Sequence, residues 1–115
     1  MTIYVFEDNL LWSSRLVQTL KSFGHEPLVR TAIPEEPLTG RIAIVNLGSP
    51  KIDAANLVPR LRERGVHVIG HAGHKEKEVL ELGRLAGCDT IVTNSELTFK
   101  IEGLLKSVIE NLENS

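Results

Sequence analysis

The sequence predicts an α/β fold of three layers, with helices covering both faces of a five-stranded parallel sheet. One observation is the apolar run Ile42–Asn46, which is rich in isoleucine and valine and is typical of a strand buried on both faces. Another is a junction that recurs at Gly24, Gly65 and Gly87, where a helical pattern ends and a strand-like run begins. Strands that alternate with helices in this way run parallel and are joined by right-handed crossovers. Five such strands in 115 residues fit the order 2-1-3-4-5.

Length, charge and cysteine content narrow the class of protein. A chain of 115 residues is expected to form a single domain over residues 1–115, and Met1 with the polar tail Asn111–Ser115 fits a complete small protein. The net charge of −2 and the lack of a basic run argue against direct binding of nucleic acid. With one cysteine, Cys88, an internal disulfide is impossible and a reducing compartment is favoured. The sequence has neither a signal peptide nor a membrane-spanning run, so we expect no membrane association and a cytoplasmic location.

The first third of the chain predicts a strand, a helix and a weaker strand. Ile3–Phe6 is a short β-prone run, and Asn9 can cap the helix that follows it. Leu28 and Val29 centre a second strand, whose leading proline and flanking charges suit the edge of a sheet. Two prolines within Ala32–Gly40 argue against a helix there, so the second helix of such a fold is expected to be shortened or replaced by a loop. The apolar face of the first helix is expected to be Trp12, Leu16, Leu20 and Phe23.

After the central strand, the pattern predicts a helix, a fourth strand and another helix. Asp53 can cap the first of these helices, which contains Pro59; the helix is either kinked at the proline or begins late, at Asn56. Val66–Gly70 predicts the fourth strand, and residues 71–74 are expected to form the loop after it. The inward positions are expected to be Leu57, Val58 and Leu61 in the first helix and Val79, Leu82, Leu85 and Ala86 in the second.

The end of the chain predicts a fifth strand and a long helix. Asp89–Thr93 is the β-prone run, and Ser95 can cap the helix that follows. The apolar stripe of this helix is Leu97, Ile101, Leu104, Leu105, Val108 and Leu112. With this helix the chain has the elements of a flavodoxin-like fold.

The carboxyl ends of parallel strands collect at one edge of a sheet, and the sequence places polar groups there. The first, third, fourth and fifth strands end at Glu7 and Asp8, at Asn46, at His71 and at Asn94. Because ligands of open α/β sheets bind at this edge, these side chains form the candidate site. Asn46 stands at the end of the most buried strand, and its amide hydrogen-bonds well but is a weak nucleophile and a poor metal ligand.

Four stretches of the chain, taken in order, carry a resemblance that covers it almost end to end. They are Val5-Phe6-Glu7-Asp8-Asn9; Val45–Pro50 together with Asp53; Leu61–Gly65 followed by Val68-Ile69; and Leu85–Asp89. Together they resemble the receiver domain of two-component response regulators. The resemblance implies the CheY-like form of the flavodoxin-like fold, and a place in phosphorelay signal transduction.

The same resemblance implies a site chemistry that this chain has lost. In the family two acids bind Mg²⁺, an aspartate accepts a phosphoryl group, and a hydroxyl and a lysine contact that group. Glu7 and Asp8 match the acids, whereas Asn46, His71 and Asn94 stand where the aspartate, the hydroxyl and the lysine belong. We therefore predict a degenerate pseudo-receiver with no catalytic residue and no cofactor, in which only weak residual Mg²⁺ binding at Glu7 and Asp8 stays open. The favoured interpretation of the acids is a strand end that is solvated or accepts hydrogen bonds from loop amides and from Asn94.

Two classes of function stay open. The first is an atypical, phosphorylation-independent interaction module that is not an enzyme and that binds a protein partner or a second copy. By the resemblance it docks through the family's fourth helix, fifth strand and fifth helix, a face expected to include Lys75, Lys77, Arg84, Thr90, Val92 and Lys100. The alternative is a small-ligand- or metal-binding domain, or a small enzyme of flavodoxin-like fold, that uses a pocket at Asp8, Asn46 and His71.

The remaining features predict less specific roles. The spacing of His67, His71 and His74 suggests zinc, but His67 lies within a strand and its side chain is expected to face away from the other two. His71 is expected to lie beside Asp8 as a neutral or singly paired imidazole, and to respond to pH. Trp12 is expected to pack against the core, and Cys88 to be buried and unreactive.

Overall fold

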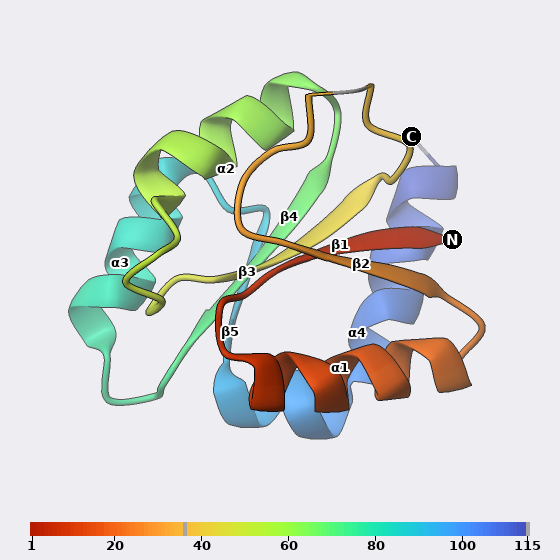
Figure 1. Cartoon of the computed structure of the whole chain (residues 1–115), viewed down its shortest axis with the longest axis horizontal. Helices are drawn as coiled ribbons and strands as arrows, with labels where there is room; N and C mark the ends of the chain where they lie inside the picture. The colour runs from red at the N-terminus through yellow and green to blue at the C-terminus, as the bar shows by residue number, and fades with distance from the viewer. Residues whose placement is uncertain (36, 115) are drawn as a thin grey trace.

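The centre of the molecule is a sheet of five parallel strands in the order β2-β1-β3-β4-β5 (Figure 1). The computed structural model describes residues 1–35 and 37–114. The strands are β1 Thr2–Phe6, β2 Glu26–Arg30, β3 Ile42–Asn46, β4 His67–Ala72 and β5 Thr90–Thr93. The helices are α1 Leu10–Ser22, α2 Ala54–Glu63, α3 Lys77–Ala86 and α4 Asn94–Glu113. The predicted fold class and strand order are confirmed.

Helices α1 and α4 cover one face of the sheet, and α2 and α3 cover the other (Figure 1). The central strand shows why the layers form, because its side chains alternate between the two faces. Ile42 and Ile44 pack with the residues of α1 and α4, and Ala43 and Val45 pack with those of α2 and α3. None of these four side chains is exposed, so burial of each large one stabilises the fold by about 1.5–3 kcal/mol. The prediction that this strand is buried on both faces is confirmed.

Polar caps set the starts of three helices. The side-chain oxygens of Asn9 and Asp53 accept hydrogen bonds from the backbone N–H of Trp12 and Asn56, as predicted. The predicted cap Ser95 is wrong, because α4 begins earlier, at Asn94. Its cap is Thr93, which exchanges two hydrogen bonds with Glu96, at 2.9 Å and 3.2 Å. This reciprocal Thr–Glu pair satisfies two backbone N–H groups at once, so it outcompetes a single serine.

Two further boundaries differ from the prediction. Helix α2 starts directly after its cap, at Ala54 and not at Asn56, so Pro59 lies inside the helix and beyond its first turn. Strand β4 ends at Ala72 and not at Gly70, so the predicted loop at residues 71–74 begins two residues later. The ladder continues because His71 pairs in register with strands on both sides, opposite Asn46 and Val92.

The buried face of α3 is only partly the predicted one: Val79 and Ala86 pack against the core as predicted, whereas Leu82 and Leu85 do not. Leu82 and Leu85 are 46% and 69% exposed, and the helix instead turns Val79, Leu80, Gly83 and Ala86 toward the core. The cause is the side chain of Leu47, which fills the space beside Gly83: a Cβ added there would lie 2.4 Å from a Leu47 methyl group. The close approach of the glycine backbone orients the helix, and it leaves two leucines in water.

The long helix α4 buries its stripe as predicted. Leu97, Ile101, Leu105 and Val108 are buried, and Leu104 and Leu112 are partly buried. At Lys100 the backbone leaves the helical region, with φ −121° and ψ 15°, so the helix is interrupted there. None of the helices within residues 1–35 and 37–114 is long and apolar enough to cross a membrane.

The connection between β2 and β3 has no helix in its described residues, 31–35 and 37–41. This agrees with the predicted loss of the second helix. Glu36, within the predicted loop, and Ser115, in the predicted polar tail, lie outside the described residues. The hydroxyl of Tyr4 accepts a hydrogen bond from the backbone N–H of Thr39, at 3.0 Å, and so ties the loop to β1.

Candidate functional site

The carboxyl edge of the sheet brings the five candidate residues into two groups. Glu7 and Asp8 follow β1, and the end of β3 places Asn46 beside them. His71, near the end of β4, meets Asn94, the first residue of α4. The sheet thus brings the predicted residues to one edge, but the sequence did not reveal which of them pair with one another.

Glu7 is a buried acid whose oxygens are satisfied by N–H donors. The side-chain nitrogen of Asn46 lies 2.7 Å from one carboxylate oxygen and 3.0 Å from the other. The backbone N–H groups of Asp8 and Asn9 donate to Oε2, at 3.0 Å and 3.1 Å. The Oδ1 of Asn46 accepts from the N–H of Gly48 at 3.0 Å, which fixes the direction of the amide. A buried carboxylate that accepts this many hydrogen bonds is stabilised without a counterion.

Asp8 has a separate partner. The hydroxyl of Ser49, itself buried, donates to Asp8 Oδ1. The expectation that loop amides satisfy the acids is therefore confirmed for Glu7, whereas the expected contact with Asn94 is wrong. Sequence reasoning missed Ser49 as a partner; the only signal was its place in the turn after β3.

His71 is enclosed by an amide and an indole. Its Nδ1 lies 2.7 Å from Asn94 Oδ1, so this nitrogen carries the proton and donates it. The ring stacks on Trp12 with centroids 4.8 Å apart and planes 17° apart, and the side chain is 1% exposed. Burial lowers the pKa of His71, against the opposing effects of the Asn94 bond and of nearby Glu76. The imidazole is therefore neutral at neutral pH, and Trp12 has a contact at the site that its predicted packing role did not include.

The residues at this edge do not fit the Mg²⁺ ion that the resemblance implies. Asn46 and Ser49 already donate to the carboxylates of Glu7 and Asp8, and the nearby carboxylate of Glu76 accepts from the backbone N–H of Gly73. A hard divalent cation needs several oxygen ligands and prefers carboxylates. Within residues 1–35 and 37–114, no group of three or more acidic, histidine or cysteine side chains is placed to hold a metal ion.

The histidines do not form a zinc site either. His67 begins β4 and its Nε2 lies 3.0 Å from the hydroxyl of Thr90, whereas His71 is near the other end of the strand and His74 is exposed. Cys88 is partly buried, and burial raises the pKa of its thiol to about 11. A thiol with so high a pKa is protonated at neutral pH, which agrees with the expected lack of reactivity.

The predicted docking residues lie on α3, β5 and α4, except Lys75, which precedes α3. Lys75, Lys77, Arg84 and Lys100 are exposed, and Thr90 and Val92 are partly buried. Val92 and Lys100 line a hollow of about 340 Å³, together with Glu96, Gly103 and Leu104. Arg84 is paired on its own helix with Glu81, at 2.9 Å.

Comparison with known proteins supports the fold. No model of a protein family matches the sequence, and no curated protein sequence matches it. By structure the chain is similar to a two-component response regulator from Clostridium difficile, with a TM-score of 0.79 and 12% identity over 97% of this chain and 98% of that one. It is also similar to a CheY-like receiver domain protein from Methanospirillum hungatei, with a TM-score of 0.74 and 18% identity over 98% and 94% of the two chains. For the NtrC4 receiver domain the TM-score is 0.72 and the identity 18%, over 98% and 97%.

These neighbours establish the architecture. The chain has the fold of response-regulator receiver domains, as the sequence motifs predicted. At such low identities the likeness shows the fold alone, and the function has to be argued from the residues.

Proposed function

We propose that this chain is a pseudo-receiver, a signalling module that acts by binding another protein and does not depend on phosphorylation. The observation that carries the proposal is the pairing of Asn46 with Glu7. Asn46 stands at the position of the phosphoacceptor, and its amide is far less nucleophilic than a carboxylate. The amide nitrogen donates to Glu7 and the amide oxygen accepts from the N–H of Gly48, so hydrogen bonds fix this side chain at the end of the strand.

The rest of the site supports the same proposal. A transferred phosphoryl group is stabilised by cations, and the position of the family's lysine is held by Asn94, whose oxygen is bound to His71. The hydroxyl position is held by His71, a buried neutral ring. We infer that the module has no catalytic activity and no resident cofactor, and that its single cysteine suits a cytoplasmic location.

Without chemistry at the strand ends, the function depends on a binding surface. We propose that the protein partner binds the α3–β5–α4 face. It exposes Leu82 and Leu85 beside a mixed set of charges, a combination that suits specific, salt-sensitive association. Strand β5 is one of the two edge strands of the sheet. A structural neighbour, the NtrC4 receiver domain, is described as a dimer when activated by beryllofluoride, which supports association through surfaces of this fold.

Mass spectrometry tests the proposal directly. The protein is incubated with acetyl phosphate and Mg²⁺, beside a receiver domain that retains its aspartate as the positive control. We expect the mass of this chain to stay unchanged while the control gains a phosphoryl group. Gain of a phosphoryl group at any residue of the strand ends contradicts the proposal.

A further inference from the structure

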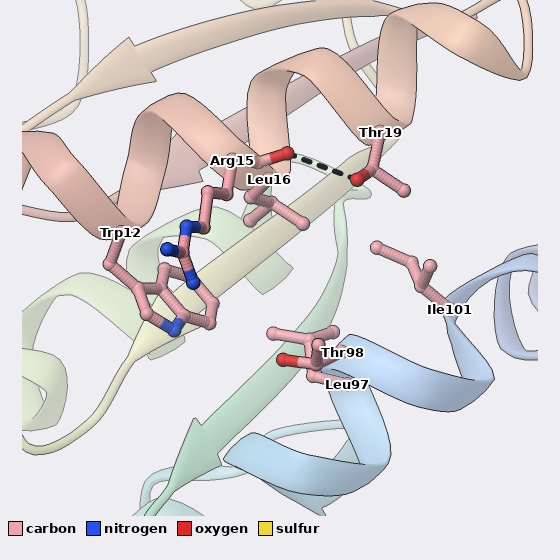
Figure 2. A pocket seen from close by; sticks show the side chains of 7 residues that line it. All are labelled: Trp12, Arg15, Leu16, Thr19, Leu97, Thr98 and Ile101. Carbon is pink, nitrogen blue, oxygen red and sulfur yellow. Dashed lines mark hydrogen bonds between the residues drawn. The ribbon is translucent and has the colours of Figure 1, made fainter.

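A hollow between α1 and α4, called here the α1–α4 hollow, has an apolar floor (Figure 2). Its volume is about 90 Å³, and the apolar side chains that line it are Trp12, Leu16, Leu97 and Ile101. Leu16, Leu97 and Ile101 are buried members of the core, so the floor of the hollow is part of the packed interior. Water on such a floor has few hydrogen-bond partners, so an apolar group that displaces it gains binding free energy.

The volume of the hollow sets the size of that apolar group. A water molecule takes about 30 Å³ in the liquid, and an engineered apolar cavity of about 150 Å³ holds benzene. The α1–α4 hollow, at about 90 Å³, is smaller than an aromatic ring needs. It suits a branched alkyl group of about three or four carbons.

The polar groups at the hollow can donate hydrogen bonds. Arg15 on α1 and Thr98 on α4 face it from opposite helices (Figure 2). The hydroxyl of Thr19 already donates to the backbone oxygen of Arg15, at 3.0 Å. None of the lining residues is acidic, and no carboxylate within residues 1–35 and 37–114 forms an ion pair with Arg15. The hollow therefore presents one uncompensated positive charge and one hydroxyl donor.

These donors discriminate between classes of small molecule. A guanidinium group donates two parallel hydrogen bonds to a carboxylate, and such charged pairs are stronger than neutral ones. An ammonium group would meet the like charge of Arg15 and no acid, so amines and amino acids are disfavoured. A neutral amide of the same shape keeps the apolar contact but loses the ion pair. The lining thus selects an anion that carries a short alkyl group.

We propose that the α1–α4 hollow binds a short branched carboxylate of about the size of isovalerate. The alkyl group lies on the apolar floor, and the carboxylate pairs with Arg15 and accepts a hydrogen bond from Thr98. One wall of the site is Trp12, whose ring stacks on the buried imidazole of His71 with centroids 4.8 Å apart. Bound carboxylate therefore contacts the indole that packs on the edge of the sheet. The hollow is not lined by the acids or the amides of that edge, so this site is separate from the degenerate phosphoacceptor pocket.

The fluorescence of Trp12 tests the proposal, because the chain has one tryptophan and its indole lines the hollow. Titration of the native protein with sodium isovalerate, at neutral pH and constant ionic strength, is expected to change the emission along a saturable curve. It is also expected to raise the thermal midpoint, since the ligand binds the folded state. Acetate lacks the branched alkyl group, isovaleramide lacks the charge, and isoamylamine reverses it. Each of the three is expected to bind more weakly than isovalerate by about tenfold or more.

Two variants remove one polar contact each. Arg15→Gln removes the charge, and Thr98→Val keeps the shape of the side chain but removes the hydroxyl. Both side chains are exposed, so both variants are expected to keep the thermal midpoint of the native protein without ligand. Arg15→Gln is expected to weaken binding of isovalerate by about tenfold or more, and Thr98→Val by a smaller factor. Lys21→Gln removes the same charge from the same helix outside the hollow, and as the matched control it is expected to leave binding unchanged.

The proposal is overturned if isovalerate gives no saturable change in emission and no rise in the thermal midpoint. It is also overturned if isovaleramide binds as tightly as isovalerate, since the hollow then does not select an anion. Equal weakening by Lys21→Gln and Arg15→Gln overturns it as well, because the acid is then attracted by the overall charge of α1. These outcomes do not depend on whether the chain accepts a phosphoryl group, which mass spectrometry measures separately.

Discussion

The side-chain nitrogen of Asn46 spans both carboxylate oxygens of Glu7, at 2.7 Å and 3.0 Å. This pairing determines what the strand end can do. A neutral donor satisfies a buried acid, so the acid is held in place without a metal ion. The amide that stands where the resemblance places the phosphoacceptor therefore also stabilises the fold.

Replacing this amide by a carboxylate is expected to cost stability and to create a metal site. In Asn46→Asp the new acid faces Glu7, the donor is lost, and the free energy of unfolding is expected to fall by about 1–3 kcal/mol at neutral pH. Mg²⁺ is expected to restore the loss, because three carboxylates then converge and the ion binds only the folded state. Thermal midpoints with and without Mg²⁺ measure both effects.

Asn46→Ala is the matched control, since it removes the same donor without adding a charge. It is expected to be destabilised and to gain nothing from Mg²⁺. Phosphorylation of Asn46→Asp is not expected to shift the resonances of α3, because His71 and Asn94 supply neither a hydroxyl nor a cation for the phosphoryl group. Shifts that spread to α3 after treatment with a phosphoryl mimic count against this view.

Stability is expected to fall as the solution is acidified, through the buried imidazole of His71. Burial lowers its pKa below that of the unfolded chain, which is about 6.5. Below that pH the unfolded state binds more protons than the folded state, so the contribution of the neutral ring is complete above the unfolded pKa and is lost as the pH falls through the folded pKa. Urea unfolding from neutral to acidic pH measures the slope.

His71→Gln provides the comparison for this slope. Glutamine keeps a side-chain donor for Asn94 but does not titrate, so the variant is expected to lose less stability on acidification than the native chain. The pKa values of His25 and His67 are also lowered by burial, so part of the slope is expected to remain. Equal slopes for the two proteins would show that His71 does not carry the effect.

The sequence predicted the sheet because the pattern of β3 is strong and leaves one interpretation. Four apolar residues followed by a polar one predict a buried strand that ends at Asn46, and the structure agrees. The caps at Asn9 and Asp53 were equally local, since each acts within three residues. Such signals predict the structure correctly because they depend only on residues that are close in the chain.

The predictions that failed depend on contacts between distant parts of the chain. Helical spacing made Leu82 and Leu85 good core residues, but Leu47 packs against Gly83 and turns them outward. The pairing of His71 with Asn94, across 23 positions, has no local signal. The stack of Trp12 on the same ring also joins two elements that only the fold brings together.

The contact between Leu47 and Gly83 is expected to make this glycine hard to replace. Alanine favours a helix over glycine by about 1 kcal/mol, but at Gly83 its methyl group meets Leu47 at a distance no packed pair allows. Overpacking costs about 1–3 kcal/mol, so Gly83→Ala is expected to be net destabilising. Gly103→Ala is the matched control, since nothing lies within 4 Å of the added carbon in α4, and it is expected to stabilise. Urea unfolding measures the free energy of unfolding of both variants. A stabilised Gly83→Ala would mean that the side chain of Leu47 moves to make room for the added methyl group.

Charge reversal on the α3–β5–α4 face is expected to weaken binding of the partner without unfolding the chain. Arg84 and Lys100 are exposed, and an exposed ion pair such as Arg84 with Glu81 contributes little to stability because solvent screens it. Arg84→Glu and Lys100→Glu are therefore expected to keep the thermal midpoint nearly unchanged, and to reduce the amount of partner that an affinity column carrying the chain retains from native cytosol. Arg64→Glu, an exposed reversal at the end of α2, is the matched control and is expected to retain the partner. If both reversals retain every partner that the native chain binds, while changes in the loop between β2 and β3 release them, the docking face lies on that flank of the sheet.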